Sequence, residues 1–96
     1  MLIDDYAVDV LMRDLVGHDR QPSSFLIYLW LTFEASRTRR ERVQVSYQTV
    51  ADAVGISKSA AQTGVRWLLK RKLIETRKNG PTAVPAYRVL RPWRDS

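Results

Sequence analysis

The sequence contains no cysteine and a single histidine, His18, among its 96 residues. The lack of cysteine excludes disulfides, thiolate catalysis and zinc sites built on sulfur, and it is consistent with a reducing intracellular environment. His18 shares a polar linker with Asp14 and Asp19, which is more typical of a solvated loop than of a catalytic dyad. No phosphate-binding loop, nucleophile motif or metal-ligand spacing occurs. We therefore expect no enzymatic activity, no cofactor and no metal.

Long apolar runs are also missing. The longest run extends from Phe25 to Leu31, with Phe33 after it, and it has about half the length needed to span a bilayer. The N-terminus is acidic and lacks the basic start and apolar stretch of a signal peptide. We expect a cytoplasmic protein with no role in a membrane.

Positive charge, by contrast, is abundant and unevenly distributed. The net charge is +6, from 16 Lys and Arg against 10 Asp and Glu. Residues 1–19 carry five acids and one base, a net −4, whereas residues 20–96 carry fifteen bases and five acids, a net +10. This balance favours a polyanionic partner that binds the part of the chain after the first helix. A solvated, solubilising surface has the same composition, so charge alone does not decide.

The first periodic segment, residues 4–16, predicts an amphipathic helix that stops at Gly17. Its apolar stripe has the i, i+3, i+4, i+7 spacing and consists of Val8, Leu11, Met12 and Leu15. Two uses of this stripe remain open, homodimerisation and packing against the rest of the chain. We treat residues 1–22 as an N-terminal helix and linker, and residues 23–96 as the main domain.

A second helix is expected from a serine cap, Ser23 or Ser24, to about Ser36. It is apolar almost all round, so a second surface must cover its other side, either the first helix or a partner subunit. A basic loop follows at residues 37–42. Residues 43–46 then alternate apolar and polar as in a short strand, which ends at Ser46, the expected cap of the next helix.

Two further helices are predicted around a tight turn. Residues 47–54 form a short amphipathic helix, and Gly55 can adopt the left-handed conformation that ends it. Ser57 then caps a longer helix from Lys58 to about Lys72. Its inner face is expected to contain Ala61, Val65 (or Gly64), Leu68 and Leu69.

The segment TVADAVGISKSAA, residues 49–61, closely resembles the helix-turn-helix signature. Ala51 stands at the small position that lets the second helix pack closely, Gly55 at the turn and Ile56 at the apolar position after it. The continuation LLKRKLI, residues 68–74, resembles the end of a winged helix-turn-helix, where the recognition helix leads into the first wing strand. The chain looks most like replication-initiator or regulator modules of bacteria, plasmids and phages. The resemblance implies a mainly α fold with a small antiparallel β wing, here with an extra N-terminal helix.

Two positions depart from the family pattern. Gly64 stands where an alanine or a larger apolar residue is usual, which indicates unusually close packing or a weaker helix. Lys72 stands at a usual glycine position. Because lysine tolerates left-handed geometry poorly, we expect this helix end to differ from the family form.

The wing is predicted as residues 73–78, a turn at Asn79-Gly80-Pro81-Thr82, and residues 86–90. Basic side chains there suit a phosphate backbone, but they also protect an exposed edge strand. Trp67, on the preceding helix, is expected to pack on the first helix or the wing rather than on nucleic acid.

The resemblance implies a recognition helix, residues 58–72, whose exposed face enters the major groove. The expected base contacts are Lys58, Ser59, Gln62, Thr63 and Arg66. The expected backbone contacts, which position the protein without reading sequence, are Ser46, Tyr47, Gln48, Lys70, Arg71, Arg77 and Lys78. Ser46 to Gln48 equally suit a helix cap.

The function that follows is sequence-specific binding of double-stranded DNA, as a transcriptional regulator or as a module of a replication initiator, in association with the nucleoid. The alternative is a winged helix that binds another protein, because fold does not fix function. A protein-binding version is expected to expose apolar or acidic residues on the recognition face, whereas this helix offers Lys58, Gln62 and Arg66.

Overall fold

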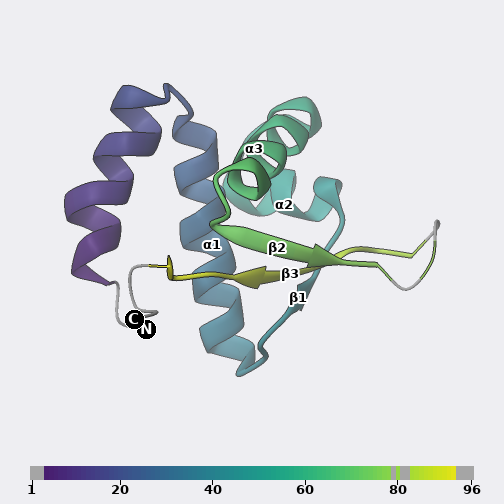
Figure 1. The fold of residues 1–96 in the computed structure, drawn as a ribbon. Coiled ribbons are helices and arrows are strands. Elements are labelled where there is room, and N and C mark those ends of the chain that lie inside the picture. The colour runs from purple at the N-terminus through teal and green to yellow at the C-terminus, as the bar shows by residue number, and fades with distance from the viewer. Residues whose placement is uncertain (1–3, 79, 81–82, 93–96) are drawn as a thin grey trace.

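The protein is described by a computed structural model that covers residues 4–78, 80 and 83–92. An N-terminal helical segment contains two π-helical stretches, η1 (Ala7–Leu11) and η2 (Arg13–His18), and packs against the long helix α1 (Pro22–Thr38). The remaining elements are β1 (Val43–Gln44), α2 (Tyr47–Val54), α3 (Lys58–Lys70), β2 (Ile74–Arg77) and β3 (Ala86–Val89). The chain is therefore mainly helical with a small antiparallel sheet (Figure 1).

The three strands are ordered β1-β3-β2, and both pairings are antiparallel. In the register, Tyr87 at the centre of β3 faces Val43 on one side and Thr76 on the other. β1, which precedes α2, and β2, which follows α3, are thus joined only through β3. In Figure 1, α3 lies above this sheet and the turn after α1 lies below it.

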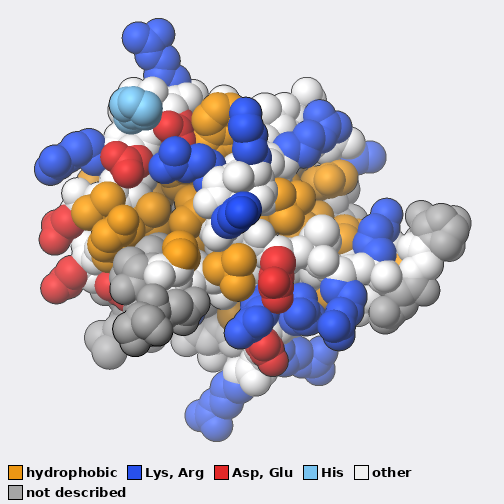
Figure 2. Space-filling model, viewed as in Figure 1, with side chains coloured by type: hydrophobic (Ala, Val, Ile, Leu, Met, Phe, Trp, Pro, Cys, Tyr) orange, Lys and Arg blue, Asp and Glu red, His pale blue; other side chains and the backbone are white. Residues whose placement is uncertain are grey.

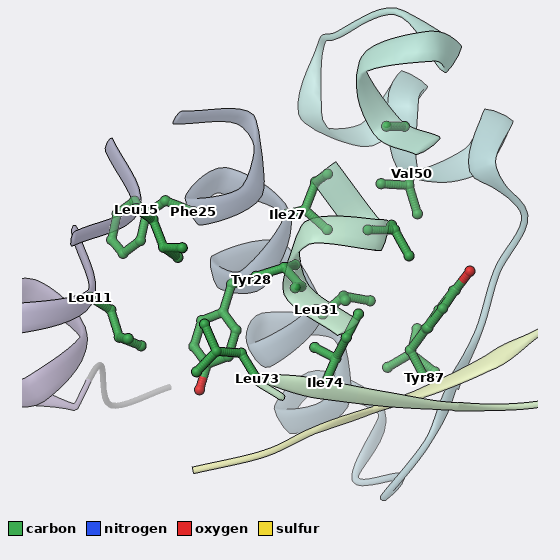
Figure 3. Close-up of a cluster of buried hydrophobic side chains, with 14 of the residues drawn as sticks. Leu11, Leu15, Phe25, Ile27, Tyr28, Leu31, Val50, Leu73, Ile74 and Tyr87 are labelled. Atoms are coloured by element: carbon green, nitrogen blue, oxygen red, sulfur yellow. The ribbon is translucent and has the colours of Figure 1, made fainter. Parts of the chain in front are cut away.

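The core is one continuous cluster with α1 at its centre. Figure 3 shows Leu11 and Leu15 on one side of α1, and Val50, Ile74 and Tyr87 on the other. The buried side chains of α1 are Ser24, Phe25, Ile27, Tyr28 and Leu31. The sequence of this helix predicts that two surfaces must cover it. The N-terminal segment is one of them.

The N-terminal segment differs from the expected α-helix. Its buried residues are Ala7, Leu11 and Leu15, whereas Val8 and Met12 are exposed. Bonds such as Asp19 N–H to Asp14 O, 2.7 Å, span five residues and widen each turn, so residues four apart lie nearly above one another. The predicted spacing, i, i+3, i+4, i+7, assumes narrower turns. The predicted stop at Gly17 is also wrong, because helical structure continues to His18.

α1 begins at Pro22, so the predicted serine cap at Ser23 or Ser24 is wrong. Pro22 occupies the first turn, where its missing N–H costs nothing, and no side chain caps the helix. The end also lies beyond Ser36, at Thr38, followed by Arg39 with φ 55°. Ser24, freed from capping, is fully buried and donates a hydrogen bond of 3.1 Å to the carbonyl of Gly64.

Close packing of α1 on α3 explains the glycine at position 64. A Cβ atom there would lie 2.6 Å from Cδ1 of Ile27, closer than side chains pack. Of the two readings of this glycine, the structure confirms close packing. Gly64 and Val65, predicted as alternatives for one inner-face position, are both buried and both face the core. Leu69, also predicted on this face, is only partly buried.

The end of α3 differs from the geometry expected for Lys72. The helix ends at Lys70, and Lys72 adopts the left-handed conformation with φ 58° that was expected to be avoided. The Leu73 N–H donates to Leu68 O at 3.0 Å, and the Lys72 N–H donates to Leu69 O at 3.1 Å. These are the two bonds of a Schellman motif. They satisfy the free carbonyls of the helix end and hold a lysine in the place of glycine.

The strands are shorter than predicted. β1 ends at Gln44, although the Val45 N–H still donates to Pro85 O at 3.2 Å. β2 and β3 cover 74–77 and 86–89 rather than 73–78 and 86–90. In the predicted turn, only Gly80 belongs to the described residues, and Asn79, Pro81 and Thr82 lie outside them.

Candidate nucleic-acid interface

Two serine caps fix the directions of α2 and α3. The N–H of Thr49 donates to Ser46 Oγ at 3.1 Å, and the N–H of Ala60 donates to Ser57 Oγ at 3.0 Å. Between the helices, Gly55 adopts φ 86° and ends α2 as predicted. Both helices turn a buried face toward α1, and the opposite face of α3 is left open to solvent.

The open face of α3 carries the residues expected to contact bases. Lys58, Ser59, Thr63 and Arg66 are exposed, and Gln62 is partly buried. Because these positions recur at i, i+1, i+4, i+5 and i+8, they form one stripe about two turns long. Among the described residues, neither Lys58 nor Arg66 has a carboxylate within salt-bridge distance. The stripe therefore presents two uncompensated cations with amide and hydroxyl groups between them.

A groove of about 390 Å³ separates the start of α2 and α3 from the β2–β3 hairpin. Its lining combines two sets of predicted contacts, namely Ser46, Tyr47, Gln48 and Lys78 from the expected backbone contacts and Lys58 from the expected base contacts. Its remaining lining is Leu69, Thr76, Ala83, Val84, Pro85 and Tyr87. The groove thus has cations and hydroxyl groups near an apolar lining.

The charge in this groove is positive. Lys58 and Lys78 are exposed, and Lys78, like Lys58, has no salt bridge within the described part of the chain. Burial raises the pKa of Tyr87, and the neighbouring phenol of Tyr47 raises it further. Tyr87 is therefore neutral at physiological pH. On α2, the carboxylate of Asp52 accepts a hydrogen bond of 2.9 Å from Nε2 of Gln48.

Thr76 and Tyr87 line the groove but are not among the contacts predicted from the sequence. Alternation along a strand places Thr76 on the same face as Lys78 and sends Arg77 to the other face. That signal was present in the sequence. The place of Tyr87 could be predicted only from the strand register, which pairs it with Thr76 across the hairpin.

Besides Arg77, two more of the expected backbone contacts lie outside the groove. Lys70 and Arg71 line a different cavity, of about 450 Å³, at the C-terminal end of α3. There the Lys70 ammonium lies 5.1 Å from the ring centre of Trp67, and Arg71 Nε lies 3.6 Å from Asp19 Oδ2. The structure therefore does not bring these two side chains together with the groove.

The expected dimer contacts divide into two groups. Leu11 and Leu15 are buried against α1 and are not available to a partner subunit in this fold. Val8 and Met12 are exposed, together with Val16. Figure 2 shows apolar side chains open to solvent over the N-terminal segment.

Comparison with protein-family models and with curated proteins finds no match to this sequence. In the part of the chain that the structure describes, no helix has both the length and the hydropathy needed to cross a membrane.

Proposed function

We propose that this chain is a winged helix-turn-helix module that binds double-stranded DNA. In this proposal α3 enters the major groove, and the groove beside it, between the start of α2 and the β2–β3 wing, holds one phosphate backbone. The module serves a transcriptional regulator or a replication initiator.

The observation that carries this proposal is the meeting of Lys58 and Lys78 at one groove. They come from α3 and from the residue after β2, and Ser46, Tyr47 and Gln48 from the start of α2 lie beside them. Two ammoniums and polar donors along one groove suit the regularly spaced phosphates of a DNA strand. Next to it, the exposed stripe of α3 offers Gln62 for adenine and Arg66 for guanine.

The test is duplex binding measured by fluorescence anisotropy at several salt concentrations. For a backbone-contacting protein, the logarithm of the association constant falls linearly with the logarithm of the salt concentration, by about 0.9 per phosphate contact. The double variant Lys58→Gln, Lys78→Gln is therefore expected to reduce the slope by about 2 and to weaken binding to every duplex.

The matched control removes two exposed arginines far from the groove, Arg13→Gln with Arg20→Gln, and so changes the net charge equally. We expect it to keep nearly the wild-type slope. Equal loss in both double variants would mean that only net charge matters. No duplex binding by the wild-type protein at low salt would overturn the proposal.

A further inference from the structure

A second basic surface lies away from α3 and the groove. It consists of six arginines at the end of α1, in the turn before β1, and on and after β3, namely Arg37, Arg39, Arg40, Arg42, Arg88 and Arg91. We call it the arginine surface. In Figure 1 the end of α1 and the turn before β1 lie below the sheet, β3 lies within it and α3 lies above it, and Figure 2 shows basic side chains gathered in this lower region with a few acidic ones among them.

The acids on this surface neutralise only part of its charge. Glu34 binds Arg37 at 2.7 Å, and Glu41 binds Arg88 at 2.9 Å. Glu75 serves both Arg42 at 3.1 Å and Arg88 at 3.3 Å. Three carboxylates thus face six guanidiniums, and within the described residues Arg39, Arg40 and Arg91 have no acidic partner. A net positive charge is left on the surface.

Two of the three unpaired arginines, Arg40 and Arg91, line one hollow together with the paired Arg88. The hollow has a volume of about 340 Å³, and Thr32 and Ser36 from α1 lie beside the three arginines. Glu41 also lines it, and its carboxylate is paired with Arg88. Among the residues that the structure describes, no aromatic side chain contributes to it, and its apolar lining is limited to Ala35 and Val89. Protein-binding hot spots are enriched in Trp and Tyr as well as Arg, and the described lining of this hollow contains only the arginines of that set. Guanidinium groups and hydroxyls are, by contrast, suitable donors for phosphate oxygens.

We propose that the arginine surface binds the phosphate backbone of a second segment of double-stranded DNA. This proposal rests on the proposed function, in which α3 and the groove hold the first segment. Because the groove and the hollow share no lining residue, one copy of the chain can bridge two duplexes or hold two parts of a looped one. Binding at the arginine surface is expected to be independent of sequence and strongly salt-dependent, because the surface offers charge without a helix face for base readout.

A bridging assay tests this. One duplex is tethered, the protein is bound to it, and capture of a labelled second duplex is measured. The variant Arg40→Gln, Arg91→Gln is expected to bind the tethered duplex within about twofold of wild type but to capture at least about tenfold less of the second. The charge-matched control Arg13→Gln, Arg20→Gln is expected to behave as wild type in both steps. Equal capture by the two double variants would overturn the proposal, and so would bridging that persists in Arg40→Gln, Arg91→Gln through a protein dimer.

Two further arms separate the possible failures. If Lys58→Gln, Lys78→Gln keeps full binding to a single duplex while Arg40→Gln, Arg91→Gln loses it, the groove function fails and the arginine surface stands as the DNA site. Soluble poly-glutamate and soluble unlabelled duplex are compared as competitors at equal total charge. Stronger competition by poly-glutamate for the second site would show an acidic protein surface to be the partner, against the proposal.

Discussion

The indole Nε1 of Trp67 donates a hydrogen bond of 2.9 Å to Oδ2 of Asp19, across 48 positions of sequence. The same carboxylate lies 3.0 Å from Nδ1 of His18 and 3.6 Å from Nε of Arg71. Its side chain is only 5% exposed. Asp19 therefore joins the linker after the N-terminal segment to the C-terminal part of α3, and it holds one end of the proposed recognition helix in place.

The first prediction concerns pH and Asp19. Burial raises the pKa of this carboxyl, but hydrogen bonds from His18 and Trp67 and the charge of Arg71 outweigh burial. The net result is a pKa below the ordinary 3.8. Because the folded-state pKa is the lower one, the carboxylate stabilises the fold above pH 3.8, and this stabilisation is lost as pH falls through the folded-state value.

Asp19→Asn is therefore expected to lower the free energy of unfolding by about 1–3 kcal/mol near neutral pH. The difference from wild type should shrink in acid, below pH 3.8. Urea unfolding over a pH series measures it, and Asp9→Asn, at an exposed position of the same segment, provides a control expected to show little change. A difference that does not depend on pH would contradict the charge-based explanation.

The second prediction uses the close approach of α1 and α3. In Gly64→Ala, the better helix propensity of alanine, worth about 1 kcal/mol, opposes overpacking against Ile27, which costs about 1–3 kcal/mol. Ile27 is fully buried, so its Cδ1 atom has little room to move. We expect a net loss of about 1 kcal/mol.

Ile27→Val removes the methyl group that a Cβ at position 64 would meet. The double variant Gly64→Ala, Ile27→Val is therefore expected to be more stable than the sum of the single changes indicates. Strict additivity in thermal or urea unfolding would argue against the contact as the cause. Thr63→Ala, exposed on the same helix, gives a gain in helix propensity without the contact, and this gain is smaller than the one expected from glycine to alanine.

The contrast between these contacts shows what the sequence predicts. Ser46, Gly55 and Ser57 act within three or four residues of their own position, so local patterns identified their roles correctly. The partners Asp19 and Trp67, or Ser24 and Gly64, are brought together only by the packing of whole helices. No local pattern contains that information. The glycine at 64 nevertheless signalled a close approach without naming its partner.

The candidate site follows the same division. The exposed stripe of α3 follows from helical periodicity, and the structure leaves it open to solvent. The groove depends on how the β2–β3 hairpin is placed against α2 and α3, so the grouping of Lys58 with Lys78 and the separation of Lys70 could not be read from spacing. The π-helical turns of the N-terminal segment also escaped prediction, because α-helical periodicity was assumed.

The third prediction concerns the end of α3. A left-handed residue other than glycine costs about 1–2 kcal/mol, and Lys72 carries this cost with φ 58°. Glycine there relieves the strain but increases the entropy of the unfolded chain by about 0.5–1 kcal/mol. We expect Lys72→Gly to raise the free energy of unfolding by up to about 1 kcal/mol. Lys72→Ala, which removes the side chain and its charge but keeps the strain, is expected to give no gain. A similar gain from both changes would point to charge repulsion instead.

The last prediction separates base contacts from backbone contacts. Arg66 lies on the exposed stripe of α3, eight residues after Lys58 and thus about 12 Å further along the helix, whereas Lys78 lines the groove. A guanidinium that binds guanine discriminates by about 1–3 kcal/mol at one base pair, whereas a phosphate contact is blind to sequence. Selection from random duplexes by the wild-type protein first defines the preferred site. Arg66→Ala is then expected to relax the preference at a single position of that site, and Lys78→Ala to weaken preferred and unrelated duplexes by the same factor and lower the salt slope by about 1. An unchanged preference in Arg66→Ala would remove this residue from base readout, and a changed preference in Lys78→Ala would mean that the wing, too, reads sequence.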